Sequence, residues 1–286
     1  MFGFLNVNKP KGMTSHDVVA KIRRVTKIKQ VGHTGTLDPF AEGVLPICIG
    51  KSTRLIEYLN DDKEYLATVQ FGKNTDSYDL DGEITQTFEK RITREDLEKV
   101  LPCFRGEISQ KPPIYSAIKV NGKKLYDYAR QGETIEIKER QVTITKLELV
   151  EFDETQQTAK LAVACSKGTY IRSIAFDIGQ KLECGAYLSA LQRTKAGNFT
   201  IDNAFSLEEL TTSEIVSQKL INPIEVLPQP KHILTDKEKE RVSHGMSIFN
   251  TENLPNSDIV ILIYSGKIHA VGEVEQEKIK VKKVLG

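Results

Sequence analysis

The spacing of apolar residues along this chain changes repeatedly between the period of two that is typical of strands and the period that is typical of helices. Residues 44–50, 64–71, 112–120, 141–152 and 158–166 are strand-like, whereas residues 17–26, 51–59, 93–101 and 170–182 are helix-like. The two kinds do not follow the regular strand–helix spacing of a Rossmann fold or an α/β barrel. We therefore predict an α/β protein of the α+β kind with a mixed, largely antiparallel sheet.

A change in pattern near residues 222–232 divides the chain. Three prolines interrupt the sequence NPIEVLPQPKH, and a helix-like stretch and two apolar runs joined by Ser265–Gly266 follow it. A Ser–Gly step between apolar runs indicates a hairpin. We expect a large domain over 1–228 and a small, β-rich appendage over 229–286.

Composition indicates an ordinary cytoplasmic protein. The 286 residues include no basic stretch followed by an apolar run at the N-terminus, and no apolar run approaches the length of a membrane helix. The four cysteines are widely spaced, which favours reduced core residues over a zinc or redox site. We expect no membrane association and no metal.

Positive charge is unevenly distributed although the formal net charge is only +1. Lys and Arg crowd residues 9–29, and a second cluster over 105–130 is mixed with tyrosines. Basic stripes with aromatic side chains suit a groove for a polyanion such as nucleic acid. Solvated charged surfaces with tyrosines in the core would give the same pattern, so both interpretations stay open.

Two stretches that resemble known ligand loops lack residues that such loops require. A phosphate-binding loop that ends at Gly50–Lys51–Ser52 needs a glycine at position 45, which is a leucine. A calcium loop over 77–88 would begin at Ser77 and end at Phe88, where carboxylates are needed. We therefore expect neither nucleotide hydrolysis nor calcium binding.

Asp38 is the candidate that remains in the glycine-containing stretch 31–55. Glycines at 32, 35 and 43 flank it and would let backbone approach a ligand closely. An aspartate before a proline is more often a simple turn former. The residues of the stretch alone leave these two interpretations open.

The stretch GHTGTLDPFAEGVLP, 32–46, closely resembles the catalytic motif of the TruB-type tRNA pseudouridine synthases. Further similarities follow in the order that this family shows. They are LNVNKPKGMTSHDVV at 5–19, KEYLATVQFGKNTDSYDLDGEI at 63–84, QKPPIYSAIKVNGKKLYDYAR at 110–130, SKGTYIRSIAFDIG at 166–179 and CGAYLSALQRTKAG at 184–197.

This resemblance implies roles for individual residues. Asp38 would be the catalytic carboxylate, Arg172 its cationic partner, and Tyr65 the aromatic residue that stacks on the target base. An isolated buried carboxylate would become neutral, so a cation beside Asp38 is needed to keep it ionised. The implied substrate-binding residues are His33, Tyr170, Leu191, Lys9, Pro10, Lys119 and Arg130.

The implied activity is the isomerisation of uridine 55 in the T loop of tRNA to pseudouridine, with the base flipped out of its stack. The reaction involves no redox change or external group, so we expect no cofactor and no metal. The expected partner is the T arm of tRNA, bound by a monomer without protein partners, and 229–286 would be a PUA-like RNA-binding domain.

Two alternatives remain. The chain could be a guide-RNA-dependent pseudouridine synthase subunit, or a tRNA-binding or folding protein in which catalysis is secondary. Tyr187 and Gln192 stand where many relatives have histidine and arginine, which affects expected RNA contacts rather than the carboxylate chemistry.

Overall fold

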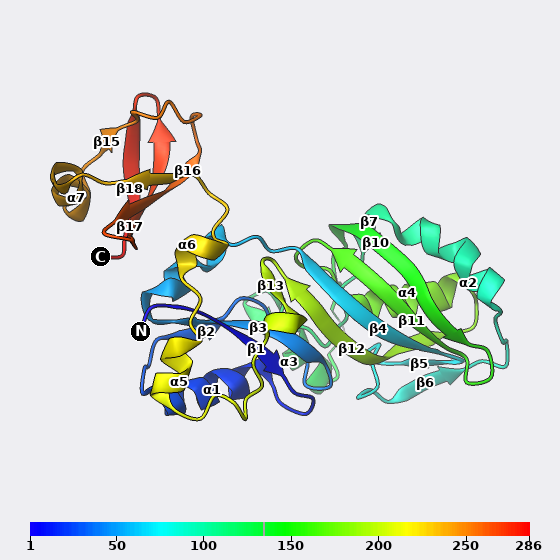
Figure 1. Ribbon diagram of the computed structural model, residues 1–286. Helices are drawn as coiled ribbons and strands as arrows, with labels where there is room; N and C mark the ends of the chain where they lie inside the picture. The colour runs from blue at the N-terminus through cyan, green and yellow to red at the C-terminus, as the bar shows by residue number, and fades with distance from the viewer. Residues whose placement is uncertain (134) are drawn as a thin grey trace.

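A long mixed sheet forms the body of the molecule. The computed structural model describes residues 1–133 and 135–286, and Figure 1 shows the sheet crossing the body with a small lobe at one end. Strand order is β1-β3-β12-β4-β11-β10-β7, with β2 beside β3 and β13 beside β12. The strands are β1 Gly3–Lys9, β2 Val31–His33, β3 Glu42–Ile49, β4 Lys63–Phe71, β7 Gly106–Gln110, β10 Arg140–Asp153, β11 Thr158–Cys165, β12 Ala186–Ala196 and β13 Phe199–Thr200.

Pairing along the sheet confirms the predicted fold class. The neighbouring strands run antiparallel, except that β3 and β12 are parallel where Glu42 and Gly43 face Gln192 and Arg193. Gly43 is needed at this contact, because its φ is +105° and a Cβ there would lie 2.3 Å from the carbonyl oxygen of Arg193. The parallel contact therefore joins the segment after Asp38 to the middle of the sheet.

Short elements and helices complete the body. The helix α1 begins at Ser15, two residues before the predicted start, where Thr14 and Asp17 form a capping box, and Thr93 and Asp96 cap α2 in the same way. The remaining elements are α1 Ser15–Thr26, β5 Lys73–Thr75, β6 Ile84–Thr87, α2 Arg94–Val100, η2 Leu101–Phe104, β8 Lys119–Val120, β9 Lys123–Lys124, α3 Leu125–Arg130, α4 Ile171–Lys181, η3 Ile201–Asn203, α5 Ser213–Gln218 and α6 Pro223–Val226.

Two expectations about local structure need correction, and one strand was not predicted. The predicted helix over 51–59 is a 3₁₀ segment, η1 Gly50–Tyr58. The predicted strand over 112–120 is wrong except for β8, because Pro112 and Pro113 have no N–H to donate to a ladder. The strand β12 is absent from the sequence prediction although it lies at the centre of the sheet.

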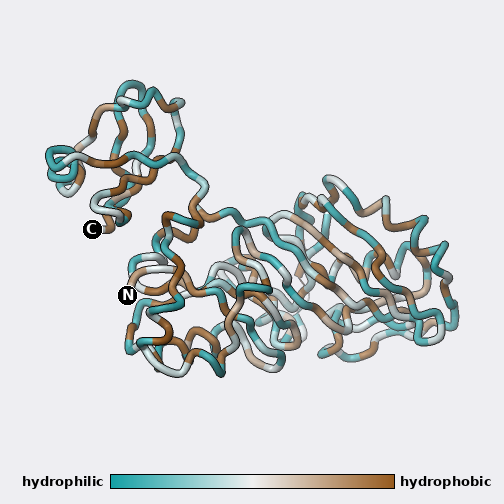
Figure 2. Tube along the Cα trace, in the orientation of Figure 1, coloured by the Kyte–Doolittle hydropathy of each residue, from teal (hydrophilic) through white to brown (hydrophobic). Residues whose placement is uncertain are grey.

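The main apolar core lies between the sheet and the helices of the body. Buried side chains from α1, β1, β3, β4, β11, α4 and β12 form one cluster. Figure 2 shows hydrophobic and hydrophilic residues alternating along the strands, as a sheet with differing faces requires. This core fixes the ends of β2, β3, β4, β12 and α4, from which the candidate site is built.

The small lobe has a sheet and a core of its own. Its strand order is β14-β16-β17-β18-β15, and its core includes Leu234, Val242, Val260 and Leu262. Its Ser265 and Gly266 both have positive φ, which confirms the predicted hairpin. The elements are β14 Lys231–Ile233, α7 Asp236–Ser243, β15 Ile248–Phe249, β16 Ile259–Tyr264, β17 Lys267–Glu275 and β18 Lys278–Val284.

An apolar cluster is shared between the lobe and the body. Ile261, Ile263 and Val271 of the lobe pack in one cluster with Phe4 and Leu55 of the body. The lobe is therefore seated on the body rather than tethered beside it. The division of the chain at 228/229 into two domains stays a prediction.

Candidate active site

Asp38 lies in the loop between β2 and β3, and backbone hydrogen bonds hold that loop in place. The Ser15 hydroxyl at the start of α1 donates to the Leu37 carbonyl at 3.0 Å and accepts from the Leu37 N–H at 2.8 Å. The Asp38 carbonyl accepts from the Ala41 N–H at 3.1 Å. The Asp38 side chain remains 34% exposed, so the loop presents a carboxylate that a ligand can reach.

Arg172, near the start of α4, contacts this carboxylate through two nitrogens. Its Nε lies 3.1 Å from Asp38 Oδ2, and its Nη2 donates to Asp38 Oδ1 at 3.4 Å. The guanidinium is only 7% exposed. A planar fork of this kind fixes the orientation of the carboxylate as well as its charge. The structure thus brings Asp38 and Arg172 together, as the resemblance implies.

Asp79 is a second carboxylate on the same guanidinium, and sequence reasoning missed it. Arg172 Nη1 lies 3.0 Å from Asp79 Oδ2, and the Asp79 side chain is 5% exposed. Its other oxygen accepts from the Ser77 hydroxyl at 2.5 Å and from the Asp81 N–H at 3.1 Å. The available signal is the acidic run 76–81, which holds three aspartates.

Opposing effects act on the protonation of Asp38. Burial raises the pKa of Asp38, and the nearby Asp79 carboxylate raises it further. The Arg172 guanidinium is the largest influence that lowers the pKa of Asp38, followed among the lowering groups by Lys9. Arg172 is therefore the group on which ionisation of Asp38 depends.

Tyr65 lies on β4 directly opposite Arg193 of β12. Its side chain is buried, and burial raises the pKa of the Tyr65 phenol while Arg193 opposes that rise. Arg193 is also a residue that sequence reasoning missed. An arginine inside the apolar run YLSALQR was the available signal, because arginine is seldom fully buried without a reason.

Lys9 is the last residue of β1. It lies close to Asp38, but its side chain is fully buried, and its ammonium donates to the carbonyls of Met13 at 2.7 Å, Pro10 at 2.9 Å and Pro39 at 3.4 Å. Burial lowers the pKa of Lys9 to about 8. Lys9 thus ties the loop after β1 to the loop of Asp38, and its part in substrate binding stays a prediction. Pro10 beside it is exposed.

Tyr170 lies at the start of α4, the helix that carries Arg172, and Leu191 lies on β12. Tyr170 caps α4, and the Gln110 side chain accepts from its N–H at 2.8 Å and donates to its carbonyl at 3.0 Å. Leu191 on β12 is 6% exposed and lies two residues before Arg193, so the two share a face of the sheet. Both positions are consistent with the lining of a base pocket.

His33 ends β2 and is half-buried. Its ring makes an edge contact with His16, with centroids 5.4 Å apart. Within the described residues, its Nδ1 is buried without a hydrogen-bond partner. Burial lowers the pKa of His33, followed by the influence of His16. The ring is therefore neutral at physiological pH. In the sequence, His33 directly precedes the loop of Asp38.

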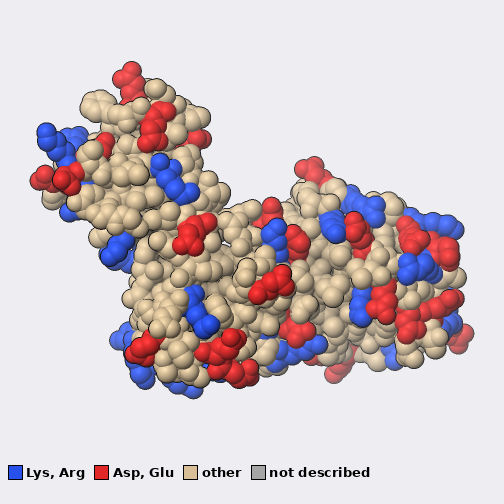
Figure 3. Space-filling model, viewed as in Figure 1, with Lys and Arg blue, Asp and Glu red and all other residues tan. Residues whose placement is uncertain are grey.

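Lys119 and Arg130 belong to the hairpin β8–β9 and the helix α3, which follow Tyr115. The Tyr115 carbonyl accepts from Arg172 Nη2 at 3.0 Å, so this hairpin is connected to the site through its backbone. Both side chains are exposed, and Arg130 lies over the Tyr126 ring at 5.4 Å. On the face shown in Figure 3, basic and acidic side chains are mixed, so that face is not a uniformly basic surface.

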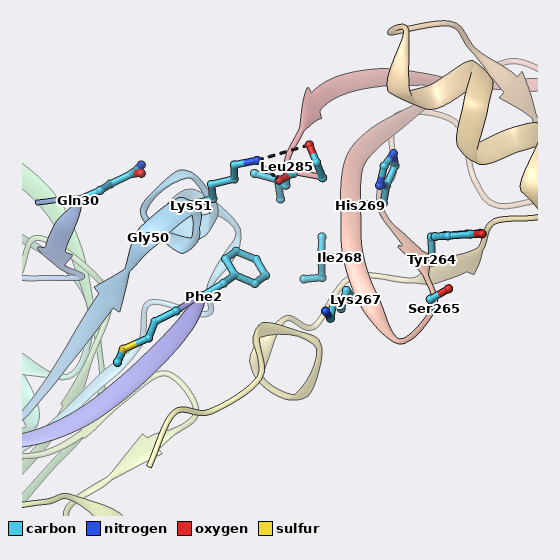
Figure 4. A pocket seen from close by; sticks show the side chains of 12 residues that line it. Phe2, Gln30, Gly50, Lys51, Tyr264, Ser265, Lys267, Ile268, His269 and Leu285 are labelled. Carbon is cyan, nitrogen blue, oxygen red and sulfur yellow. Dashed lines mark hydrogen bonds between the residues drawn. The ribbon is translucent and has the colours of Figure 1, made fainter. Parts of the chain in front are cut away.

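Lys51 of the sequence Gly50–Lys51–Ser52 acts far from Asp38. Its ammonium donates to the carbonyl of Leu285 at 2.7 Å, and Figure 4 shows it reaching from η1 toward the end of the chain. Arg54 donates to the Val284 carbonyl at 2.7 Å. These contacts border a pocket of about 550 Å³ between the body and the lobe. The sequence that resembles a phosphate loop therefore holds the lobe in place.

Neither a membrane helix nor a metal cluster occurs in the part of the chain that the structure describes. No helix within 1–133 and 135–286 has the length and hydrophobicity needed to span a bilayer. In the same ranges, no group of three or more His, Cys, Asp or Glu side chains is arranged to hold a metal ion.

Two family models match adjacent parts of the chain. The TruB family pseudouridylate synthase N-terminal domain matches residues 23–171, and the tRNA pseudouridylate synthase B C-terminal domain matches residues 172–227. Asp38, Tyr65 and Tyr170 fall in the first model, and Arg172 and Leu191 in the second.

Curated relatives match over their full length. A protein named tRNA pseudouridine synthase B from Caldanaerobacter subterraneus is 44% identical over 99% of both chains. One of the same name from Carboxydothermus hydrogenoformans is 45% identical over 100% of this chain and 99% of its own.

Solved structures of a more distant relative share the fold. A crystal structure of a Cbf5–Nop10–Gar1 complex matches with a TM-score of 0.75 at 26% identity, covering 99% of this chain and 84% of that one. An H/ACA RNP bound to a substrate RNA containing 2′-deoxyuridine matches with a TM-score of 0.74 at 26% identity, covering 100% and 85%.

Replacing Asp38 by asparagine is expected to stabilise the protein at neutral pH. Because the folded pKa of Asp38 is raised, the charged form destabilises the fold, and this penalty grows as pH rises from the unfolded pKa through the folded one. The free energy of unfolding in urea, measured from pH 3.5 to 8, should therefore be higher for Asp38→Asn toward neutral pH and equal to wild type at the acid end.

Asp17→Asn is the matched control with the opposite sign. Hydrogen bonds from Thr14 lower the pKa of Asp17, so its charge stabilises the fold above the unfolded pKa and that stability is lost as pH falls through the folded pKa. Asp17→Asn should destabilise the protein toward neutral pH. The same direction of change in both variants would contradict the assigned electrostatics.

Proposed function

The chain belongs to the TruB family of pseudouridylate synthases, and from this premise we propose that it isomerises uridine 55 in the T loop of tRNA, with Asp38 as the catalytic carboxylate. The observation that carries the proposal is a reachable carboxylate held by the fork of a buried arginine. The enzyme acts on tRNA in the cytoplasm as a monomer that needs no guide RNA.

The chemistry explains why a carboxylate is placed here. The bond between uracil N1 and ribose C1′ breaks, the base turns, and a bond forms between C5 and C1′. The proton on C5 is lost and N1 gains a proton, so the product is an isomer with no net redox change. Cleavage of the glycosidic bond develops positive charge on the sugar, which the Asp38 anion stabilises or traps.

Accessibility distinguishes Asp38 from Asp79. Both carboxylates contact Arg172, but the Asp38 side chain is 34% exposed and that of Asp79 only 5%. The carboxylate oxygens of Asp79 also already contact Ser77, the Asp81 N–H and the guanidinium. Asp38 is thus the group that reacts, and Asp79 acts through Arg172 as a positioning residue.

The surrounding side chains suit a base that has left its stack. Tyr65, Tyr170 and Leu191 supply aromatic and apolar surfaces for the uracil ring, and a flipped base needs such surfaces. His33, half-buried and neutral, occupies the position from which the uridine leaves the loop. Pro10 lies at the rim. Lys119 and Arg130 contact the RNA backbone, and the lobe acts as a PUA-like RNA-binding appendage.

A stand-alone enzyme is favoured over a guide-dependent subunit. The relatives at 44% and 45% identity carry the name of a tRNA synthase, whereas the Cbf5 structures are 26% identical. A protein that only binds or folds tRNA would have no need to keep a carboxylate reachable at the cost of burying an arginine beside it.

Tritium release from C5 tests the reaction. A T-arm hairpin labelled at C5 of its uridines is incubated with the protein alone, without guide RNA, metal or cofactor. Wild type should release tritium, Asp38→Asn should lose at least about 10³-fold in rate, and Asp79→Asn should lose less because Asp38 remains. Asp61→Asn removes an exposed carboxylate paired with Lys167 and should match wild type.

The location of the new pseudouridine decides the finer assignment. Chemical mapping of the product should find it at the position corresponding to uridine 55. Tight, salt-sensitive binding without tritium release would contradict the stand-alone enzyme, and uracil release without pseudouridine would indicate a hydrolase instead.

Arg130→Ala tests the proposed backbone contact. Each lost phosphate contact should weaken binding of the T arm and reduce the slope of log affinity against log salt by about one. Filter binding between 50 and 300 mM salt measures this slope. Arg94→Ala is the control, since Arg94 pairs with Glu98 on α2. An unchanged slope for Arg130→Ala would place the RNA elsewhere.

A further inference from the structure

Arg193 is a fully buried cation at the centre of the sheet. Arg193 is 1% exposed. Its Nε donates to the Val44 carbonyl at 2.7 Å, its Nη2 to the Gly35 carbonyl at 3.0 Å and its Nη1 to the Thr36 carbonyl at 3.4 Å. These three acceptors are backbone carbonyls, and no salt bridge joins Arg193 to a carboxylate within the described residues.

Burial of this charge without a carboxylate is costly. Removing an ion from water costs several kcal/mol even in real proteins, and neutral carbonyls compensate only in part. An apolar side chain would fill the same space at lower cost. The positive charge and the planar guanidinium of Arg193 must therefore have a role that an apolar side chain could not fill.

Two functional elements meet at this guanidinium. Gly35 and Thr36 lie just before Asp38, so two of the three hydrogen bonds hold the loop that presents the carboxylate. Cross-strand pairing puts Arg193 directly opposite Tyr65, which places both side chains on one face of the sheet. The close β3–β12 contact at Gly43 positions the third acceptor, Val44.

We propose that Arg193 is a positioning residue for the isomerisation, which holds the Asp38 loop against the sheet and supplies a fixed positive charge beside Tyr65. The inference rests on the proposed function. Its charge also affects Tyr65 directly, since burial raises the pKa of the Tyr65 phenol and Arg193 opposes this rise. The other titratable groups that influence Tyr65 are Cys165 on β11 and Asp38, and both raise its pKa.

Two substitutions separate the fork from the charge. Arg193→Gln removes both, and Arg193→Lys keeps the charge but loses the fork. Lys195→Gln is the matched control, because Lys195 lies on the same strand, pairs with Glu64 at the surface and is 43% exposed. Folding of each variant is checked by its urea midpoint before activity is measured.

Kinetics and a tyrosine titration are the two readouts. Arg193→Gln should lower kcat for the T arm by about 10²-fold with KM within about twofold, because a loop displaced by about 1 Å disturbs the reacting geometry rather than binding. NMR of ¹³Cζ-labelled tyrosine, assigned with Tyr65→Phe, should show the Tyr65 titration moved to higher pH. Arg193→Lys should keep the titration near wild type while kcat still falls, and Lys195→Gln should change neither.

A folded Arg193→Gln protein with wild-type kcat, or with a loss confined to KM, would overturn the proposal. If that variant does not fold, Arg193→Lys decides, and an unchanged kcat there would overturn it equally. A wild-type protein without isomerase activity would instead overturn the proposed function. The Tyr65 titration would still report on the charge of Arg193 beside the phenol.

Discussion

The interaction on which this site depends is the contact of one buried guanidinium with two carboxylates. Arg172 binds Asp38 through Nε and Nη2 and Asp79 through Nη1. Three groups from three separate segments must meet for this to happen, and none of their charges is tolerable alone in the interior. Asp79 therefore fixes the arginine, the arginine fixes Asp38, and of the two carboxylates only that of Asp38 is exposed enough for a ligand to reach.

Other buried polar groups extend this arrangement into the fold. Ser15 holds Leu37, Lys9 reaches Pro39, and Arg193 binds the carbonyls of Gly35 and Thr36. Together they fix the loop of Asp38 from α1, β1 and β12. A sheet packed only for stability would use apolar residues at such positions. These buried hydrogen bonds thus fix the position of the loop at an energetic cost, which would preorganise Asp38 for the catalytic role proposed for it.

The limits of sequence prediction follow from particular residues. The 265–266 hairpin and the α+β class follow from local sequence patterns, and the structure confirms them. Asp38 and Arg172 could be paired because the resemblance names both, and an ionised buried carboxylate needs a cation. Asp79 could not be chosen from three aspartates in one loop, since only the folded chain shows which faces Arg172. The burial of Lys9 and Arg193 could not be predicted, because only their tertiary carbonyl partners explain it.

The most direct test concerns the charge of Asp38 itself, because every role proposed for it needs an anion. The ¹³Cγ resonance of Asp38 in wild-type protein, assigned by its absence in Asp38→Asn, reports whether the carboxyl group is ionised at pH 7. The account predicts an ionised Asp38, held so by Arg172. A protonated Asp38 at this pH would contradict the account, because a neutral carboxyl could neither stabilise nor trap the developing positive charge on the ribose.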